Sequence, residues 1–453
     1  MLPCQIAFQE PFSFSRAFPP LQLMNTSGPR KIYAEITTHC NLCCPMCVKW
    51  TPGSRIRESG MSLATFRRLA DALPHAEALV LNGIGEPLLH ADLPAMVELA
   101  RSHMPQSSWI GLQTNGLLLD ENTAGQLLKA GLNRLCLSLD GLDGEPAGNN
   151  GHGAHHPSTV FQALAALGRA RQAIQPVDFQ LGIEIVLMKD NIALLPDLVT
   201  QAADHGADFI LASHLLAYQA EMEHQCLFNP NTESATRLFA SHQKLAVEQG
   251  VSLVNGILPI WSNPKDENAR RICTILRQLT GEARAKNIPL HLKSLIEWHG
   301  RDLSQLASSC DRAIAIAAAR NIRLELPAPQ ALAARSCRFI EEGSVFITPE
   351  GEVTPCHALW HSYSCYMDGE EKRVTAKSLG NINQQSLAEI WNAEASRTFR
   401  REAGSYDFPF CRSCALGPCP DITNESYPFT NDCYGITVPC GHCMWCLGGV
   451  RCL

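Results

Sequence analysis

The alternation of strand-like and helix-like segments between about residue 31 and residue 250 constrains the fold of this chain more than any other feature. Short apolar runs are each followed by a segment in which apolar residues have helical spacing. We count six such steps, with strands expected at 31–37, 78–87, 109–116, 133–141, 179–190 and 207–216. Strands that alternate with helices pair in parallel, with the helices as crossovers. The sequence therefore predicts an α/β fold, either a barrel or an open sheet.

Three further segments flank this core. Residues 1–30 form an N-terminal extension that prolines and glycines interrupt, and residues 251–335 are mostly helical and bridge to the last part of the chain. Residues 336–453 are predicted to form a small Cys-rich α+β domain with a β-hairpin at 343–356 and a single helix at 386–403. The apolar residues of about the last 45 positions show no period. Such a tail cannot build a core from apolar burial alone, so we expect bound metal clusters to help hold it together.

Composition limits the partners and the compartment. The net charge of -7 gives no attraction to nucleic acid or to an anionic membrane, and no run of about 18 apolar residues predicts a membrane helix. The first residues lack the basic start and apolar run of a secretory signal, so we expect a cytoplasmic protein with neither nucleic acid nor membrane as a partner. In such a chain, 20 cysteines clustered near both ends are more often metal ligands than disulfides.

The first cysteine cluster, in the segment THCNLCCPMC, directly follows the first expected strand and has the spacing C-x3-C-x2-C at Cys40, Cys44 and Cys47. Three thiolates at this spacing can bind three irons of a cubane 4Fe–4S cluster and leave the fourth iron open to a small molecule. Cys43 is expected to point elsewhere because it is adjacent to Cys44. A fragment of a zinc knuckle is the alternative, although no fourth cysteine or histidine is well placed for it.

This arrangement resembles the radical S-adenosylmethionine (SAM) superfamily, which has this cysteine loop after the first strand of its barrel. The resemblance implies a partial (β/α)6 barrel, which matches the six steps counted above. It also implies that the open iron chelates the amino and carboxylate groups of SAM. Reductive cleavage of SAM then yields a 5′-deoxyadenosyl radical, which abstracts hydrogen from a substrate. A flavodoxin- or ferredoxin-type protein is expected to supply the electron.

The resemblance also assigns residues around the cofactor. Glu86, within Gly85-Glu86-Pro87 after the second strand, matches the Gly-Glu motif that receives the methionine amino group. The position before the third cysteine is commonly aromatic in the family but is Met46 here, so we expect its backbone to contact the adenine. Each of the polar residues can also be a solvated strand-end residue without a role. The further positions that match the cofactor pocket are Thr114, Asn115, Gly116, Ser138 and Asp140, with Glu184 expected near the ribose.

The second group of cysteines is similar to the SPASM domain, which follows many radical SAM enzymes and carries auxiliary 4Fe–4S clusters. The similarity lies in an early cysteine, in Gly351 five positions before Cys356, and in the C-x2-C-x4-C run CRSCALGPC. The internal gap is four rather than five, no cysteine follows Cys419 after three residues, and CGHCMWC adds three thiols. Two auxiliary clusters are expected, with their ligand assignment open and structural zinc as the alternative. The candidate ligands are Cys337, Cys356, Cys411, Cys414, Cys419, Cys433, Cys440, Cys443, Cys446 and Cys452, with Cys365 set aside as a loop thiol.

Together the two resemblances imply a radical SAM maturase that acts on a peptide, a protein or a cofactor precursor. The irregular tail looks like that of the subgroup that accompanies tungsten-containing aldehyde oxidoreductases, so maturation of such an enzyme is one candidate function. Modification of a ribosomal peptide precursor is the runner-up, and it would require a separate peptide-recognition module because the first 30 residues are too short for one. A non-catalytic iron–sulfur scaffold or electron carrier is an alternative from a different class, and it would need neither Glu86 nor an open iron.

Overall fold

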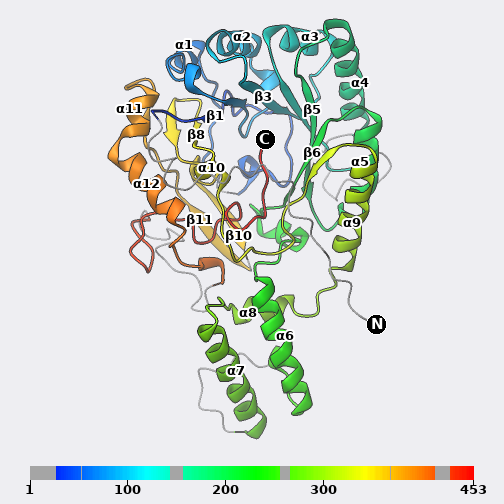
Figure 1. Cartoon of the computed structure of the whole chain (residues 1–453), viewed down its shortest axis with the longest axis vertical. Coiled ribbons are helices and arrows are strands. Elements are labelled where there is room, and N and C mark those ends of the chain that lie inside the picture. The colour runs from blue at the N-terminus through cyan, green and yellow to red at the C-terminus, as the bar shows by residue number, and fades with distance from the viewer. Residues whose placement is uncertain (1–26, 53, 143–156, 256–265, 368, 414–428) are drawn as a thin grey trace.

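We describe the fold from a computed structural model, which covers residues 27–52, 54–142, 157–255, 266–367, 369–413 and 429–453 (Figure 1). Six strands lie side by side in chain order, and each pairs in parallel with the next. The α/β class and the partial barrel of six strands are therefore confirmed. The strands are β1 (Lys31–Ala34), β2 (Ala78–Leu81), β3 (Trp109–Thr114), β4 (Arg134–Ser138), β5 (Gln180–Leu187) and β6 (Phe209–His214).

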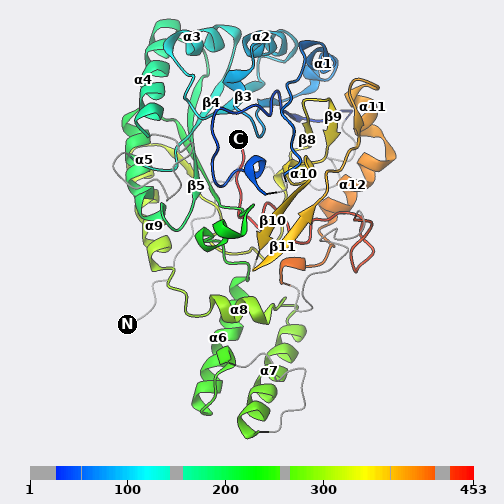
Figure 2. The same ribbon diagram turned by 180° about the vertical axis from the view of Figure 1, so that it is seen from behind.

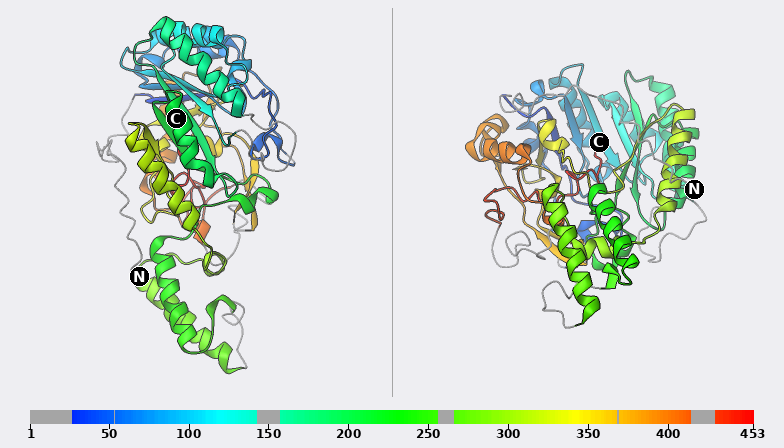
Figure 3. Two further views of the ribbon diagram at one scale, coloured as in Figure 1. Left: turned by 90° about the vertical axis from the view of Figure 1, so that its right-hand side faces the viewer. Right: turned by 60° about the horizontal axis from the view of Figure 1, so that its bottom comes forward.

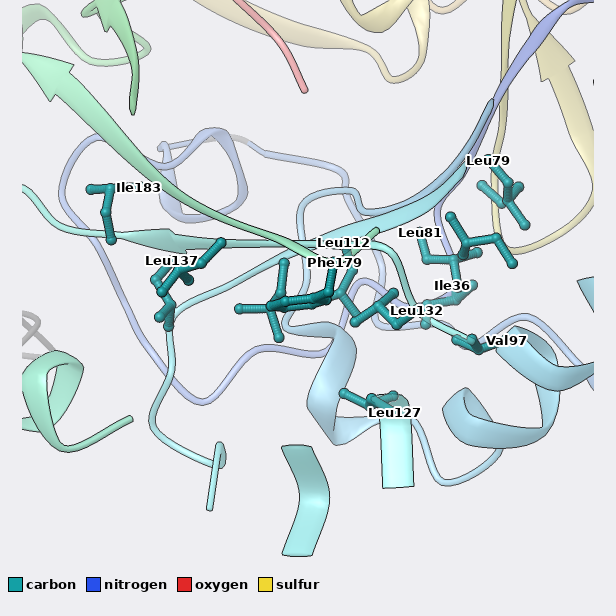
Figure 4. Packing of buried hydrophobic residues seen from close by; sticks show 14 of the residues in the cluster. Ile36, Leu79, Leu81, Val97, Leu112, Leu127, Leu132, Leu137, Phe179 and Ile183 are labelled. Atoms are coloured by element: carbon teal, nitrogen blue, oxygen red, sulfur yellow. The ribbon is translucent and has the colours of Figure 1, made fainter. Parts of the chain in front are cut away.

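Five helices cover the outer face of the curved sheet (Figure 1). Because side chains alternate along a strand, Leu79 and Leu81 of β2 face the helices, where they join the same apolar cluster as Val97 and Leu127 (Figure 4). Val80, between the two leucines, faces the barrel interior and belongs to a separate cluster. The helices are α1 (Leu63–Arg67), α2 (Leu93–His103), α3 (Glu121–Ala130), α4 (Pro157–Ile174) and α5 (Leu195–Asp204).

The sheet extends beyond these six strands at both edges. On one side β7 (Arg323–Glu325) pairs in parallel with β6, and on the other side β8 (Ser344–Ile347) pairs in parallel with β1. β9 (Glu352–Thr354) and β12 (Gly380–Asn381) continue the sheet in antiparallel fashion. The hairpin expected at 343–356 therefore forms, and its first strand joins the C-terminal domain directly to the strand that precedes the cysteine loop.

The segment after β6 contributes to two different parts of the molecule. Helices α6 (Glu233–Glu248), α7 (Glu267–Ala285) and α8 (Leu292–Trp298) share an apolar core of their own and project away from the barrel (Figure 3). Helix α9 (Ser304–Ala319) instead packs against α5 beside the barrel. The domain boundaries expected at residues 250 and 335 stay a prediction.

The C-terminal domain lies on the opposite side of the barrel from α4, α5 and α9 (Figure 2). Its single expected helix at 386–403 is wrong, because Ala393 is extended and separates two helices. The Ser396 hydroxyl donates to the carbonyl oxygen of Ile390 at 2.6 Å, and the Arg400 guanidinium donates to that of Trp391 at 2.9 Å. These two bonds satisfy carbonyl oxygens that have no intrahelical partner where the helix is interrupted. The remaining elements are α10 (Arg338–Glu341), β10 (Tyr363–Met367), β11 (Glu370–Val374), α11 (Leu387–Asn392) and α12 (Glu394–Ser405).

The last residues of the chain enter the barrel (Figure 1). The backbone N–H of His214 donates to the carbonyl oxygen of Gly449 at 2.9 Å, and the Tyr33 hydroxyl donates to that of Leu453 at 2.8 Å. Val438 and Met444 are also buried, in a cluster with residues of the barrel loops and the C-terminal helices. Apolar burial therefore contributes to holding the described part of the tail, and its dependence on bound metal stays a prediction. Its apolar partners come from elsewhere in the chain, so a period within the tail could not show them.

Candidate active site

The cysteine loop begins where β1 ends. Cys40, Cys44 and Cys47 are partly buried, whereas Cys43 is exposed. Burial raises the pKa of all three partly buried thiols, and it raises the pKa of Cys44 to about 12 with a further contribution from Cys47. When free, these three thiols are therefore protonated at neutral pH, and a bound metal must displace their protons to have thiolate ligands.

Lys49 fixes the loop from its C-terminal side. Its ammonium group is buried, and it donates to the carbonyl oxygen of Thr38 at 2.8 Å and to Glu58 at 2.9 Å. The indole N–H of Trp50 donates to the carbonyl oxygen of Leu42 at 3.1 Å. Two side chains that follow the cysteines thus bind backbone carbonyls before and between them, which holds the loop in shape.

The Gly-Glu-Pro segment packs directly against this loop. A Cβ atom at Gly85 would lie 2.3 Å from the carbonyl oxygen of Thr37, so only glycine allows this approach. The backbone N–H of Glu86 donates to the carbonyl oxygen of His39 at 2.7 Å, one residue before Cys40. Pro87 is buried and starts a short 3-10 turn.

The buried Glu86 carboxylate connects three loops. One oxygen accepts the Thr114 hydroxyl at 2.6 Å and the Leu88 N–H at 3.0 Å, and the other accepts the Asn115 N–H at 2.7 Å. The Asn115 amide in turn donates to Asn41 of the cysteine loop at 2.8 Å. Burial raises the pKa of Glu86, and the hydrogen bonds from Asn115, Thr114 and Leu88 oppose the rise. Three residues predicted from the sequence are therefore in mutual contact.

The acidic residues predicted after β4 and on β5, Asp140 and Glu184, have different neighbours. Asp140 accepts a hydrogen bond from the Val186 N–H at 2.7 Å, and its charge contributes to the raised pKa of Cys44, so it lies near the cysteine loop. Glu184 pairs with Ser138 across the two strands. Its charge acts on Cys136 and Cys452, which places it near the barrel interior. Burial raises the pKa of Asp140 to about 6, and burial followed by the Asp140 charge raises that of Glu184 to about 8.

Two of the remaining positions lie in the loops themselves. Gly116 has a φ of +79° and its N–H donates to the Thr114 hydroxyl at 3.1 Å, so the turn after β3 uses a conformation that favours glycine. Met46 is partly buried between Cys44 and Cys47. Most of the residues predicted to bind the cofactor thus lie in the loops after the carboxyl ends of β1 to β4, the edge at which barrel folds place their chemistry, whereas Ser138 and Glu184 lie within β4 and β5.

The C-terminal domain contains a second candidate site, a largely apolar cavity that is partly open to solvent. Burial raises the pKa of Cys337, and it raises the pKa of Cys356 to about 12. Among the described residues, the thiols that line this cavity are Cys337, Cys356, Cys365, Cys440, Cys443 and Cys446, and all of these but Cys365 are predicted ligands. Sequence reasoning missed Cys365, which is buried in β10 rather than in a loop. The alternation of residues in YSCYM could have indicated that strand.

The other predicted ligands are placed differently. Cys411 lies against Gly441, next to the cavity residue Cys440. The Cys452 thiol accepts the Trp445 indole N–H at 3.3 Å and lies near the barrel interior, and Cys433 is exposed. Cys414 and Cys419 lie outside the described residues.

The two sites are adjacent. Cys47 packs against the same apolar cluster as Cys337, Cys356 and Cys440. The Gln219 amide, after β6, donates to the carbonyl oxygen of Pro45 at 3.1 Å. Within the described part of the chain no three His, Cys, Asp or Glu side chains converge as ligands of a single metal ion. The case for iron–sulfur clusters at these two sites rests on the soft thiolate donors and on their dry surroundings, both of which suit such clusters.

Two family models match this chain. The model described as the radical SAM superfamily matches residues 34–199, and the SPASM model, an iron–sulfur cluster-binding domain, matches residues 337–415. The PqqA peptide cyclase of Xanthomonas campestris pv. campestris is 30% identical over 390 residues, which are 85% of this chain and 79% of that protein. The chain belongs to the radical SAM superfamily. It is an enzyme of the SPASM-containing type, so the recognition from the two cysteine patterns is confirmed.

Two further proteins align along most of this radical SAM enzyme. The tungsten-containing aldehyde ferredoxin oxidoreductase cofactor-modifying protein of Pyrococcus furiosus is 24% identical over 428 residues, 93% of this chain and 96% of that protein. The crystal structure of Streptococcus suis SuiB bound to precursor peptide SuiA has 15% identity and a TM-score of 0.48, and the match covers 90% of this chain and 76% of that chain. No helix in the described part of the radical SAM enzyme combines the length and apolarity that a membrane crossing needs.

Proposed function

We propose that this radical SAM enzyme is a maturase that abstracts hydrogen from a peptide, a protein or a cofactor precursor. The observation that carries the proposal is the Glu86 carboxylate, which joins the loops after β2 and β3 while its backbone is tied to the cysteine loop. A bound 4Fe–4S cluster and SAM would supply a 5′-deoxyadenosyl radical at this position. The chain's own residues hold and orient these groups.

Cys40, Cys44 and Cys47 are the proposed ligands of the SAM-binding cluster. Glu86 is proposed to face the methionine ammonium group, because one of its oxygens accepts a single hydrogen bond from the described residues and has capacity for another. A carboxylate opposite an ammonium group forms a charge-assisted bond that is strong in a partly dry site. The other residues proposed to line the cofactor pocket are Met46, Gly85, Pro87, Thr114, Asn115, Gly116, Ser138, Asp140 and Glu184.

The auxiliary site supports a second part of the proposal. Five of the ten predicted ligands line one cavity of the C-terminal domain, and soft thiolates in dry surroundings suit iron–sulfur clusters. We propose two auxiliary 4Fe–4S clusters, whose ligands come from the ten predicted cysteines. Zinc in place of iron is the alternative that metal analysis after anaerobic preparation would distinguish.

The two relatives support two candidate substrate classes. Maturation of a tungsten-containing oxidoreductase is the first candidate, because the cofactor-modifying protein of Pyrococcus furiosus aligns over 96% of its own length. Modification of a ribosomal peptide is the second, because the PqqA peptide cyclase shares the higher identity of 30%. A flavodoxin- or ferredoxin-type protein is the proposed reductant. The cytoplasm is the proposed location, since clustered thiols stay reduced there.

A triple variant with Cys40, Cys44 and Cys47 replaced by Ala tests the proposal. We expect the anaerobically reconstituted variant to lose about four irons and all 5′-deoxyadenosine formation from SAM, and to retain the auxiliary iron. Cys43→Ala is the matched control, because its exposed thiol lies in the same loop and is expected to be dispensable. A wild-type protein that forms no 5′-deoxyadenosine when reduced would instead indicate the non-catalytic scaffold or electron carrier.

A further inference from the structure

Glu35 is a fully buried carboxylate to which none of the roles above applies. It follows β1 and is 0% exposed. Its Oε1 accepts the backbone N–H of Ile84 at 2.8 Å, and its Oε2 lies 2.7 Å from Nε2 of His361. A buried carboxylate is costly unless it is paired and hydrogen-bonded. Both of its partners come from distant parts of the chain.

The Ile84 contact places Glu35 under the loop that carries Glu86. A Cβ atom at Gly83 would lie 2.3 Å from Cγ of Glu35, so glycine allows the loop to rest directly on this side chain. Two residues after Ile84, the Glu86 N–H donates to the carbonyl oxygen of His39. The loop is thus anchored on Glu35 at one end and on the start of the cysteine loop at the other.

The His361 contact extends the connection to the auxiliary site. His361 follows the short turn His357–Leu359, which begins directly after Cys356, a thiol of the auxiliary cavity. The neighbouring Trp360 packs edge-on against Phe346 of β8, with ring centroids 4.7 Å apart. The segment from Cys356 to His361 therefore carries a proposed cluster ligand at one end. At its other end it contacts the Glu35 carboxylate, which supports the loop that carries Glu86.

We propose that Glu35 is a positioning residue that couples the C-terminal domain to SAM binding. Its hydrogen bond with Ile84 sets the position of Glu86. Its contact with His361 makes the position of Glu86 depend on the folded turn after Cys356. The inference rests on the proposed role of Glu86 toward the methionine ammonium group. Loss of the Glu35–His361 contact is expected to weaken SAM binding about five- to fiftyfold, within the usual range for coupling between two sites.

The test measures SAM affinity in the anaerobically reconstituted full chain. Binding is followed by the change that SAM causes in the electron paramagnetic resonance spectrum of the reduced first cluster. The variants are Glu35→Gln, His361→Gln and the double variant, each with its iron content and melting temperature recorded. If the two side chains act as a pair, each single variant weakens SAM binding. The double variant should then have the same SAM affinity as the single variant that binds SAM more weakly. Should Glu35→Gln not fold, His361→Gln decides, because His361 lies nearer the surface with 16% of its side chain exposed.

Glu342→Gln is the matched control. Glu342 forms an ion pair with Lys31 at 3.0 Å. This ion pair also joins β1 to the C-terminal domain, but it lies at the end of β1 that is away from the cysteine loop. We expect this variant to bind SAM normally. Equal weakening by Glu342→Gln, or normal affinity of both Glu35→Gln and His361→Gln, would overturn the coupling.

A parallel Glu86→Gln variant separates this inference from the proposed function. If Glu86→Gln alone weakens binding, Glu86 has its proposed role and the Glu35–His361 pair is only structural. If Glu86→Gln binds SAM normally, the role of Glu86 fails, and the coupling proposal fails with it.

Discussion

The rings of Tyr218 and Tyr363 meet edge to face, with their centroids 5.3 Å apart at an angle of 80°. Burial is the main cause of the raised pKa of both phenols. Cys47 contributes at Tyr218, Cys443 contributes at Tyr363, and Cys365 contributes at both. The aromatic pair therefore lies between the cysteine loop and the auxiliary cavity, and it forms part of the packing that holds the two sites together.

Replacement of Tyr363 tests how much this packing contributes to stability. Tyr363→Ala removes a buried ring, and we expect it to lower the free energy of unfolding by about 3–5 kcal/mol. Tyr363→Phe removes only the hydroxyl that donates to the carbonyl oxygen of Ala358 at 3.0 Å, for which about 1 kcal/mol is expected. Anaerobic urea unfolding measures both. Equal losses would show that the hydrogen bond, and not the ring, carries the effect.

Thr114→Val tests whether the hydrogen bonds on Glu86 matter for SAM binding. Valine keeps the branched shape but removes the hydroxyl that donates to Glu86 at 2.6 Å. We expect SAM to bind about threefold to tenfold more weakly, the equivalent of about 0.5–1.5 kcal/mol. Thr236→Val is the control, since that buried hydroxyl in α6 has no hydrogen-bond partner among the described residues. Normal affinity of Thr114→Val would indicate that backbone donors alone orient Glu86.

Glu184→Gln is expected to stabilise the protein, and more so at high pH. The pKa of Glu184 rises from 4.5 to about 8 on folding, so between these values the folded chain binds a proton that the unfolded chain has lost. The carboxyl therefore makes the protein progressively less stable as the pH rises through this range, by up to about 1.4 kcal/mol per pH unit. Glutamine has no such dependence.

Melting temperatures at pH 5.5 and pH 8.5, without SAM and at equal iron content, measure this effect. The gain of Glu184→Gln over the wild type should be larger at pH 8.5. Glu350→Gln, at an exposed position in the β8–β9 turn, should show no comparable gain. A stabilisation that is independent of pH would contradict the assigned cause.

Leu453→Ala tests the packing of the last residues inside the barrel. Leu453 is buried in a cluster with Tyr33, Val80 and Phe209, and Gly111 leaves room for its side chain. We expect a loss of about 2–5 kcal/mol in the free energy of unfolding. Leu332→Ala, at a side chain that is 42% exposed, should cost less than about 1 kcal/mol. Equal costs would show that the segment does not contribute to the barrel core.

The elements of the barrel could be predicted because their evidence is local. The apolar run at Leu79 and Val80 and the helical spacing around Val97 each lie within a dozen residues, and their alternation determines the parallel order. The contacts of Glu86 with Thr114 and Asn115 follow from that order, because carboxyl ends of neighbouring parallel strands meet at one edge.

Other features depend on contacts between distant residues, which no local period reports. The pairing of β8 with β1 joins residues more than 300 positions apart, as does the contact of Glu35 with His361. The break at Ala393 depends on the Ser396 and Arg400 side chains that satisfy the freed carbonyls. Cys365 is expected in a loop, whereas its thiol is buried on strand β10, whose partner strand and packing bring it to the cavity.

The segment that ends at Leu453 has a consequence for the order in which the molecule assembles. Tyr33 and Leu453 are 420 positions apart, and Ser213 and Arg451 are 238 apart, yet both pairs are hydrogen-bonded inside the barrel. During synthesis from the N-terminus, the six strands emerge long before the residues that fill the space between them. Until those residues are made, the interior of the nascent barrel is not filled. Its apolar lining is then exposed to solvent, where it can aggregate or bind chaperones. Slow final docking of residues 449–453 is the expected last step of folding.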